Sequence, residues 1–150
     1  MDMVRVGAIY RLHGNASITV AEDATLDYIV ALLGHEKHLR AVFFVDSNRR
    51  FSGMMSTCEL LKYLRVNAGK QKPDVLGEFF RSAGGKKAKD LQTSTSRALS
   101  VKESDDVQTA LRLMLDYEQD VIPVLDDERK VLGDLTLSEV LSKALESGTP

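Results

Sequence analysis

The sequence predicts an α+β fold in which two β-α-β-β-α repeats, each with a small three-stranded sheet and two helices, pack as a pseudo-twofold pair. The first observation is a duplication, because residues 18–64 recur as residues 99–145. Corresponding residues are 81 positions apart in the first half of each copy and 80 apart in the second half. The second observation is the copy number, since a stacked solenoid needs three or more repeats to bury a core. Two copies are therefore expected to share one core and to leave a crevice between them.

Each copy is expected to begin with a short strand, at residues 17–20 and 99–101, and to continue as an amphipathic helix. Apolar residues recur after these strands with the i, i+3, i+4, i+7 spacing of one helix face. They are Leu26, Ile29, Val30 and Leu33 in copy one, and Val107, Ala110, Leu111 and Met114 in copy two. Asp23 and Ser104 stand at matching positions before the helices and are predicted N-caps.

A β-hairpin and a second helix are expected to complete each copy. Two short apolar runs joined by a charged turn are typical of a hairpin. These runs lie at 41–45 and 51–55 in copy one, and at 121–125 and 131–135 in copy two. Pro123 cannot donate a ladder hydrogen bond, which predicts a place at the edge or the start of a strand. The second helices are predicted at 57–64 and 137–145.

The predicted domain boundaries follow from the repeat. Repeat one spans residues 1–64, a connector spans 65–87, and repeat two spans 88–150. The connector contains glycines and a proline, which interrupt regular structure. Within it, residues 75–80 are expected to form a helical turn that packs on the core.

Composition and charge argue against several classes of protein. Of the 150 residues, 43% are hydrophobic and 28% are charged, as in an ordinary soluble domain. The net charge of −2 gives no reason to expect nucleic-acid binding. No apolar run reaches the length of about 18 residues that a membrane span requires, and the N-terminus lacks the apolar stretch of a signal peptide. The single cysteine, Cys58, is expected to be a buried structural thiol in a reducing, cytoplasmic setting.

The most chemically suggestive residues stand where the hairpin of each copy ends and the second helix begins. Copy one has Ser56 and Glu59, and copy two has Thr136 and Glu139, each a hydroxyl followed three residues later by a carboxylate. One interpretation is a capping box, in which each side chain bonds the backbone N–H of the other residue. The other is a ligand site, because a helix N-terminus suits a phosphate and a carboxylate one turn on can accept the hydroxyls of a ribose. Both interpretations fit the hydroxyls, but they compete for the carboxylates.

Together these motifs resemble the tandem CBS pair, or Bateman module, named for cystathionine β-synthase. The resemblance covers nearly the whole chain. It depends on the repeated β-α-β-β-α order, on the segment Ile122-Pro123-Val124-Leu125-Asp126, and on residues 133–140 with a weaker copy at 53–60. Residues 88–91 also look like the lead-in that precedes a CBS copy, with residues 7–10 as their counterpart.

The resemblance implies regulation rather than catalysis. CBS pairs commonly bind AMP, ADP or ATP, and sometimes S-adenosylmethionine, in crevices between the repeats. They often associate as flat homodimers, and ligand changes their packing against a partner domain. The chain is therefore expected to be a non-catalytic nucleotide sensor that modulates a partner. The alternatives are a ligand-free dimerisation or interaction module and a regulatory fragment of a larger enzyme or transporter.

The resemblance also implies which residues would hold the nucleotide. The junction hydroxyls of Ser56 and Thr136 would face phosphate, and Glu59 and Glu139 stand where the family has an aspartate that holds the ribose. The entrance of the middle strand would line the adenine, and the polar segment before each first strand would contact phosphate. These further residues are Asp120, Val121 and Ser96 in copy two, and Arg40, Ala41 and Asn15 in copy one. Because copy one has phenylalanine where copy two has Pro123, copy two is expected to hold the better site.

Other chemistry has little support in the sequence. His35 and His38 are close enough to share a helix face, but no third metal ligand is evident near them. The chain has no phosphate-binding glycine loop of the Walker or Rossmann form. Three histidines and one cysteine leave too few candidates for a nucleophile and its base. Neither a metal site nor a catalytic residue is therefore predicted.

Overall fold

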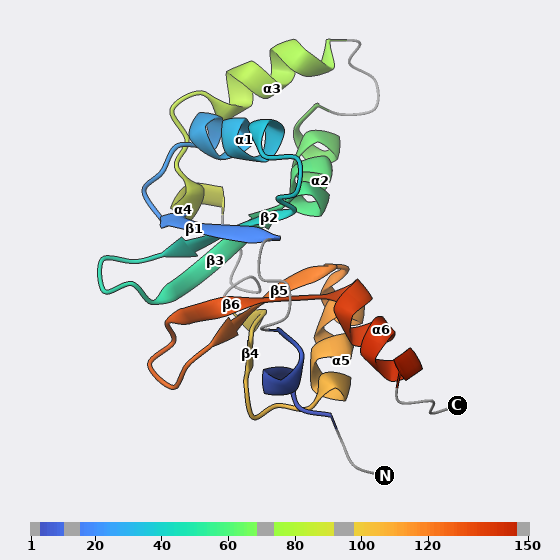
Figure 1. Ribbon diagram of the computed structural model, residues 1–150. Helices are drawn as coiled ribbons and strands as arrows, with labels where there is room; N and C mark the ends of the chain where they lie inside the picture. Colours follow the sequence, from blue (N-terminus) through green and yellow to red (C-terminus); the bar gives the residue numbers. More distant parts are fainter. Residues whose placement is uncertain (1–3, 11–15, 69–73, 92–97, 147–150) are drawn as a thin grey trace.

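Two three-stranded sheets form the framework of the molecule (Figure 1). The computed structural model describes residues 4–10, 16–68, 74–91 and 98–146. The strands are β1 (Ser17–Ala21), β2 (Ala41–Val45) and β3 (Phe51–Ser56) in repeat one, and β4 (Val101–Lys102), β5 (Val121–Leu125) and β6 (Val131–Thr136) in repeat two. In each sheet the middle strand is parallel to the first and antiparallel to the last. The predicted α+β fold is confirmed.

Helices connect these strands and cover their outer faces. The crossovers that a parallel strand pair requires are α1 (Leu26–His35) and α5 (Val107–Tyr117), and the hairpins are followed by α2 (Thr57–Ala68) and α6 (Leu137–Glu146). Figure 1 shows α1 above the upper sheet and α5 below the lower one. The connector contributes α3 (Val75–Ala83), whose Phe79 ring meets Tyr63 of α2 edge-on with centroids 6.3 Å apart. The turn expected at residues 75–80 is thus a full helix that packs on α2.

The cap of the first helix in each repeat lies two residues after the predicted one. Thr25, not Asp23, caps α1, and Asp106, not Ser104, caps α5. Each cap side chain accepts a hydrogen bond from the backbone N–H three residues on. A cap must stand directly before the first helical residue on extended backbone. Asp23 and Ser104 instead occupy the turns that lead to the caps.

Pro123 lies in the middle of the central strand of its sheet, so the prediction of an edge or start position is wrong. Its Cα partner on β6 is Asp134. On the other side, β4 pairs only with Val124 and Leu125, whereas β1 pairs with all five residues of β2. Because proline has no N–H to donate to a ladder, the shortness of β4 is what allows Pro123 this position.

Each of the two lead-in segments packs on the repeat that it does not directly precede in the sequence. The N-terminal turn η1 (Val6–Ala8) packs on repeat two, where its first N–H donates to the Asp105 carbonyl at 2.8 Å. The short helix α4 (Ala88–Leu91) packs on repeat one, where its first N–H donates to the Ala24 carbonyl at 2.8 Å. Figure 1 shows η1 (dark blue) in the half that holds β4, and α4 in the half that holds β1. Each repeat is thus completed by a segment that precedes the other repeat.

The main core lies between the two sheets. Alternate residues of a strand point to opposite faces, and Phe43 of β2 joins a buried cluster that includes Val121 and Leu135 of the other repeat. The next residue, Phe44, joins a second cluster with Ile29 of α1. Burial on both faces explains why β2 is a continuous apolar run. The shared core predicted from the duplication is confirmed.

Candidate functional site

The two strand-helix junctions lie beside the entrances of the middle strands. In each copy, the first N–H of the second helix donates to the carbonyl of the residue before the middle strand, at 3.1 Å in copy one and 2.9 Å in copy two. The junction hydroxyl residue is the Cα partner of the first residue of that strand. The predicted residues that meet in this way are Ser56, Arg40 and Ala41 in copy one, and Thr136, Asp120 and Val121 in copy two.

In copy two the junction is a complete capping box. Thr136 Oγ1 accepts a hydrogen bond from the Glu139 N–H at 3.2 Å, and Glu139 Oε1 accepts one from the Thr136 N–H at 2.9 Å. The Thr136 hydroxyl also donates to the same carboxylate oxygen at 2.8 Å. The capping interpretation therefore accounts for one oxygen of this carboxylate.

The other oxygen of that carboxylate, Glu139 Oε2, is buried and has no hydrogen-bond partner among the described residues. A buried acceptor without a partner costs roughly 1–3 kcal/mol, and more when it carries charge. The N-terminus of α6, where Glu139 lies, also offers positive potential to an anion. In copy two, Glu139 Oε2 is thus an acceptor without a partner among the described residues. Glu139 stands at the position that the family resemblance gives to the ribose contact.

In copy one a glutamine from the other repeat fills the junction. Ser56 Oγ accepts from the Glu59 N–H at 3.1 Å and donates to Gln119 Oε1 at 2.6 Å. Gln119 Nε2 in turn donates to Glu59 Oε1 at 2.5 Å. Gln119 is not among the residues predicted from the sequence. Its position could have been noticed by comparing the two copies. The residue 80 positions earlier is the apolar Leu39, so Gln119 is a polar residue where the other copy has an apolar one.

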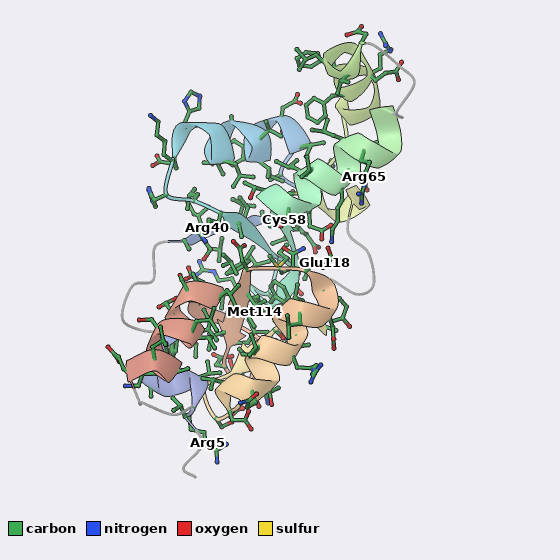
Figure 2. The ribbon with its side chains drawn as sticks, turned by 90° about the vertical axis from the view of Figure 1, so that its right-hand side faces the viewer. Arg5, Arg40, Cys58, Arg65, Met114 and Glu118 are labelled. Atoms are coloured by element: carbon green, nitrogen blue, oxygen red, sulfur yellow. The ribbon has the colours of Figure 1, made fainter. Side chains whose placement is uncertain are left out.

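Arg40 and Asp120, which were predicted at the two adenine walls, pair with each other across the repeats. Arg40 Nη1 lies 3.2 Å from Asp120 Oδ2. Figure 2 shows Arg40 at the level where the two repeats meet. Because more than a third of each side chain is exposed, the ion pair contributes only about 0–1 kcal/mol to stability. The pairing matters more for charge, since Asp120 balances the positive charge of Arg40 beside the two junctions.

A second buried carboxylate, that of Asp134, joins the two repeats. Asp134 is 1% exposed, and Ser17 Oγ of β1 donates to its Oδ2 at 2.6 Å. Burial raises the pKa of Asp134, the Ser17 hydroxyl lowers it in part, and the charge of Glu139 raises it further. Asp134 is also absent from the predicted site. The sequence marks this residue only as a carboxylate inside an otherwise apolar strand, at the position where copy one has Met54.

The remaining predictions concern positions away from the junctions. Asn15 and Ser96 lie outside the residues that the structure describes. His35 and His38 are exposed, and no group of three or more His, Cys, Asp or Glu residues that could hold a metal ion is found in residues 4–10, 16–68, 74–91 and 98–146. Over the same residues, no helix combines the length and the apolar character needed to cross a membrane.

A groove of about 630 Å³ opens beside the copy-one junction. It lies between α2, the start of α3 and the C-terminal end of α5, and it is lined by Cys58, Leu61, Lys62, Leu64, Arg65, Val75 and Glu118. Figure 2 shows Cys58 and Glu118 near the level where the repeats meet and Arg65 farther along α2. Cys58 is only partly buried, not fully buried as predicted, because its side of α2 opens into this groove. Burial still raises the pKa of the thiol, and the charge of Asp120 adds to that effect.

Comparisons with known proteins agree with this architecture. The sequence profile of the CBS domain family matches residues 88–146. A CBS domain-containing protein from Thermotoga maritima is 20% identical, with a TM-score of 0.75 and coverage of 97% of both chains. CBSX2, a protein of Arabidopsis thaliana, is 26% identical in its complex with AMP, with a TM-score of 0.67 over 97% of this chain and 99% of that one. The CBS domain pair of protein MJ0100, in complex with 5′-methylthioadenosine and S-adenosyl-L-methionine, is 18% identical, with a TM-score of 0.65 over 99% of this chain and 100% of that one. A search of curated proteins finds no match to the sequence.

Proposed function

We propose that this tandem CBS module, whose residues 88–146 form a CBS domain within the fold of a CBS pair, senses an adenosine nucleotide or a related adenosyl compound and modulates a partner protein. Structures of the same fold have been solved with AMP, with S-adenosylmethionine and 5′-methylthioadenosine, and with ATP. Its role is regulatory and non-catalytic. The free thiol of Cys58 suits a reducing compartment, and we place the module in the cytoplasm.

The observation that carries the proposal is Glu139 Oε2, a buried oxygen without a hydrogen-bond partner among the described residues. A ribose hydroxyl can donate to Oε2 while Oε1 keeps its bonds to Thr136, so the cap and the ligand contact are compatible. The N-terminus of α6 then offers its positive potential to the phosphate. Asp120, Val121 and Ser96 complete the proposed copy-two site. The corresponding copy-one set is Ser56, Glu59, Arg40, Ala41 and Asn15.

Thermal unfolding with a panel of ligands tests this function. The panel is AMP, ADP, ATP, S-adenosylmethionine and 5′-methylthioadenosine. A ligand present at 100 times its Kd and bound only to the folded state stabilises by about 2.7 kcal/mol. For a chain of this length, that energy raises the Tm by about 5–10 °C. Absence of any shift at millimolar concentrations of all five compounds contradicts the proposal.

The variant Glu139→Gln separates the cap from the ligand contact. Its amide oxygen can still accept from the Thr136 N–H, but its amide nitrogen cannot accept a hydroxyl from the ligand. We expect the ligand-free stability to stay within about 0.5 kcal/mol of wild type, and the ligand-induced Tm shift to be lost. The matched control, Glu118→Gln, changes an exposed glutamate outside both proposed sites and is expected to keep that shift. A Glu139→Gln protein with the full shift would show that Glu139 does not bind the ligand.

A second copy of the chain is the partner proposed for the exposed leucines of the helices. Leu61 on α2, Leu115 on α5, and Leu141 and Leu145 on α6 are 48–83% exposed. A homodimer that covers these side chains removes apolar surface from water. Sedimentation velocity at tens of micromolar is expected to give a dimer, and a monomer at that concentration would contradict this assignment.

A ligand-free dimerisation module is the second candidate function. It is favoured by the copy-one junction, where Gln119 already occupies Ser56 and Glu59. It predicts the sedimentation of a dimer together with no thermal shift from any compound of the panel. The nucleotide sensor predicts the dimer and the shift together.

A further inference from the structure

We infer that Gln119 closes the copy-one crevice by occupying the groups that would bind a ligand, so that the module has one working adenosyl site, in copy two. This assignment rests on the proposed function and deepens it. It makes Gln119 the residue that decides how many ligands one chain holds. Leu39, its counterpart in repeat one, offers no amide that could compete with a ligand in the same way.

Gln119 engages the Ser56 hydroxyl and one oxygen of Glu59 at the copy-one junction. A serine hydroxyl has one proton to donate, and Ser56 gives it to Gln119 Oε1 at 2.6 Å. Glu59 Oε1 accepts from Gln119 Nε2 and lies 3.6 Å from Lys62 Nζ. A phosphate that takes the Ser56 proton, or a ribose that takes Glu59 Oε1, would therefore have to displace the glutamine amide.

Displacement of Gln119 is unfavourable because the residue is buried and held by its backbone. It is 3% exposed, and its N–H donates to the Met114 carbonyl at 3.0 Å, at the end of α5. The preceding residue, Glu118, has a left-handed backbone with φ of 54° that ends the helix (labelled in Figure 2). An amide displaced from Ser56 and Glu59 would lose one buried and one partly buried hydrogen bond, which ligand binding would have to replace.

The equivalent position in repeat one, two residues before the middle strand, holds Leu39, which has no amide side chain. Leu39 and Gln119 each stand two residues before the middle strand, and the residues that follow them accept equivalent hydrogen bonds from the second helix. Leu39 is 7% exposed, and its side chain has no donor. The carboxylates differ in the same sense. Gln119 of the other repeat donates to Glu59 Oε1, whereas the described donors to Glu139 Oε1 both belong to Thr136 of the same junction.

Exchange of the two side chains tests the inference. Gln119→Leu gives copy one the leucine of copy two, and Leu39→Gln gives copy two the glutamine of copy one. The number of ligands bound per chain is measured by equilibrium dialysis against labelled AMP, with labelled S-adenosylmethionine in a parallel series. Glu118→Gln is the control, because it changes the exposed neighbour of Gln119 only. Circular dichroism verifies the fold of each variant, and Gln119→Met, which is of similar length but lacks the amide, replaces Gln119→Leu if the latter does not fold.

Wild type is expected to bind one ligand per chain, Gln119→Leu two, Leu39→Gln none, and Glu118→Gln one. A folded Gln119 variant that binds no more ligand than wild type would overturn the inference, as would a wild-type chain that already binds two. Wild type that binds none contradicts the proposed function and, with it, the working site in copy two. In that case a gain of one site in the Gln119 variant still supports the role of Gln119.

Discussion

Replacement of Ser17 by alanine is expected to lower the free energy of unfolding by about 1.5–3 kcal/mol at neutral pH. Ser17 Oγ donates to Asp134 Oδ2 at 2.6 Å, the length of a hydrogen bond to a charged acceptor. Asp134 is 1% exposed, so the lost donor is not readily replaced by bulk water. Because β1 and β6 belong to different repeats, this cost measures the contact between the repeats rather than the stability of one sheet.

The cost is expected to depend on pH in a defined direction. Burial raises the pKa of Asp134 in the folded protein above its ordinary value of 3.8, and the Ser17 hydroxyl lowers it in part. Ser17→Ala removes that lowering, so the folded pKa rises further. For a group with a raised folded pKa, the contribution to stability is fully present below the unfolded pKa and is lost as the pH rises through the folded pKa. The penalty of Ser17→Ala is therefore largest at neutral pH and smaller near or below the unfolded pKa.

Urea unfolding of wild type, Ser17→Ala, Asp134→Asn and the double variant, at about pH 7 and about pH 4, measures these effects. In the Asp134→Asn background the acceptor is neutral, and the cost of Ser17→Ala is expected to fall to about 0.5–1.5 kcal/mol. Ser47→Ala, in an exposed turn, is the control and should stay within about 0.5 kcal/mol of wild type. A cost below about 0.5 kcal/mol at neutral pH, or the same cost in both backgrounds, would refute the reasoning.

Three further substitutions test the fold, each by urea unfolding. Thr25→Ala removes the cap of α1 and should lower the free energy of unfolding by about 0.5–2 kcal/mol. Asp23→Ala should lower it by less than about 0.5 kcal/mol. The reverse order would show that Asp23 is the cap. Gly133→Ala places a Cβ 3.0 Å from Cδ2 of the Tyr10 ring and should cost about 1–3 kcal/mol, and a neutral result would mean that the ring moves freely. Phe43→Ala empties a fully buried position between the sheets and should cost about 3–5 kcal/mol; a cost below about 1 kcal/mol would contradict the shared core.

The fold was largely predictable because its main signals are local and occur twice. The apolar faces that include Ile29 and Ala110 predicted two helices whose buried residues the structure confirms. Pro123 was misplaced because the length of the neighbouring strand β4 cannot be read from the proline itself. The exchange of the lead-ins at residues 7–10 and 88–91 was out of reach for a different reason. The two repeats offer these segments equivalent places, so the local sequence does not say which one each segment takes.

The candidate site was predictable to the extent that it lies within one repeat. The spacing of Thr136 and Glu139 predicted a capping box, and the structure contains it. Gln119 needed a comparison of the two copies at a position outside any motif. The contact of Ser17 with Asp134 needed the packing of one sheet on the other, which depends on residues more than a hundred positions apart.

A crystal structure of the chain grown with AMP, and in parallel with S-adenosylmethionine, tests the central claim most directly. We expect one adenosyl ligand per chain, in copy two, with a ribose hydroxyl within about 3 Å of Glu139 Oε2 and with Gln119 still bonded to Ser56 and Glu59. A ligand bonded to Glu59 with Gln119 displaced, or a bound ligand that makes no contact with Glu139, would contradict the account.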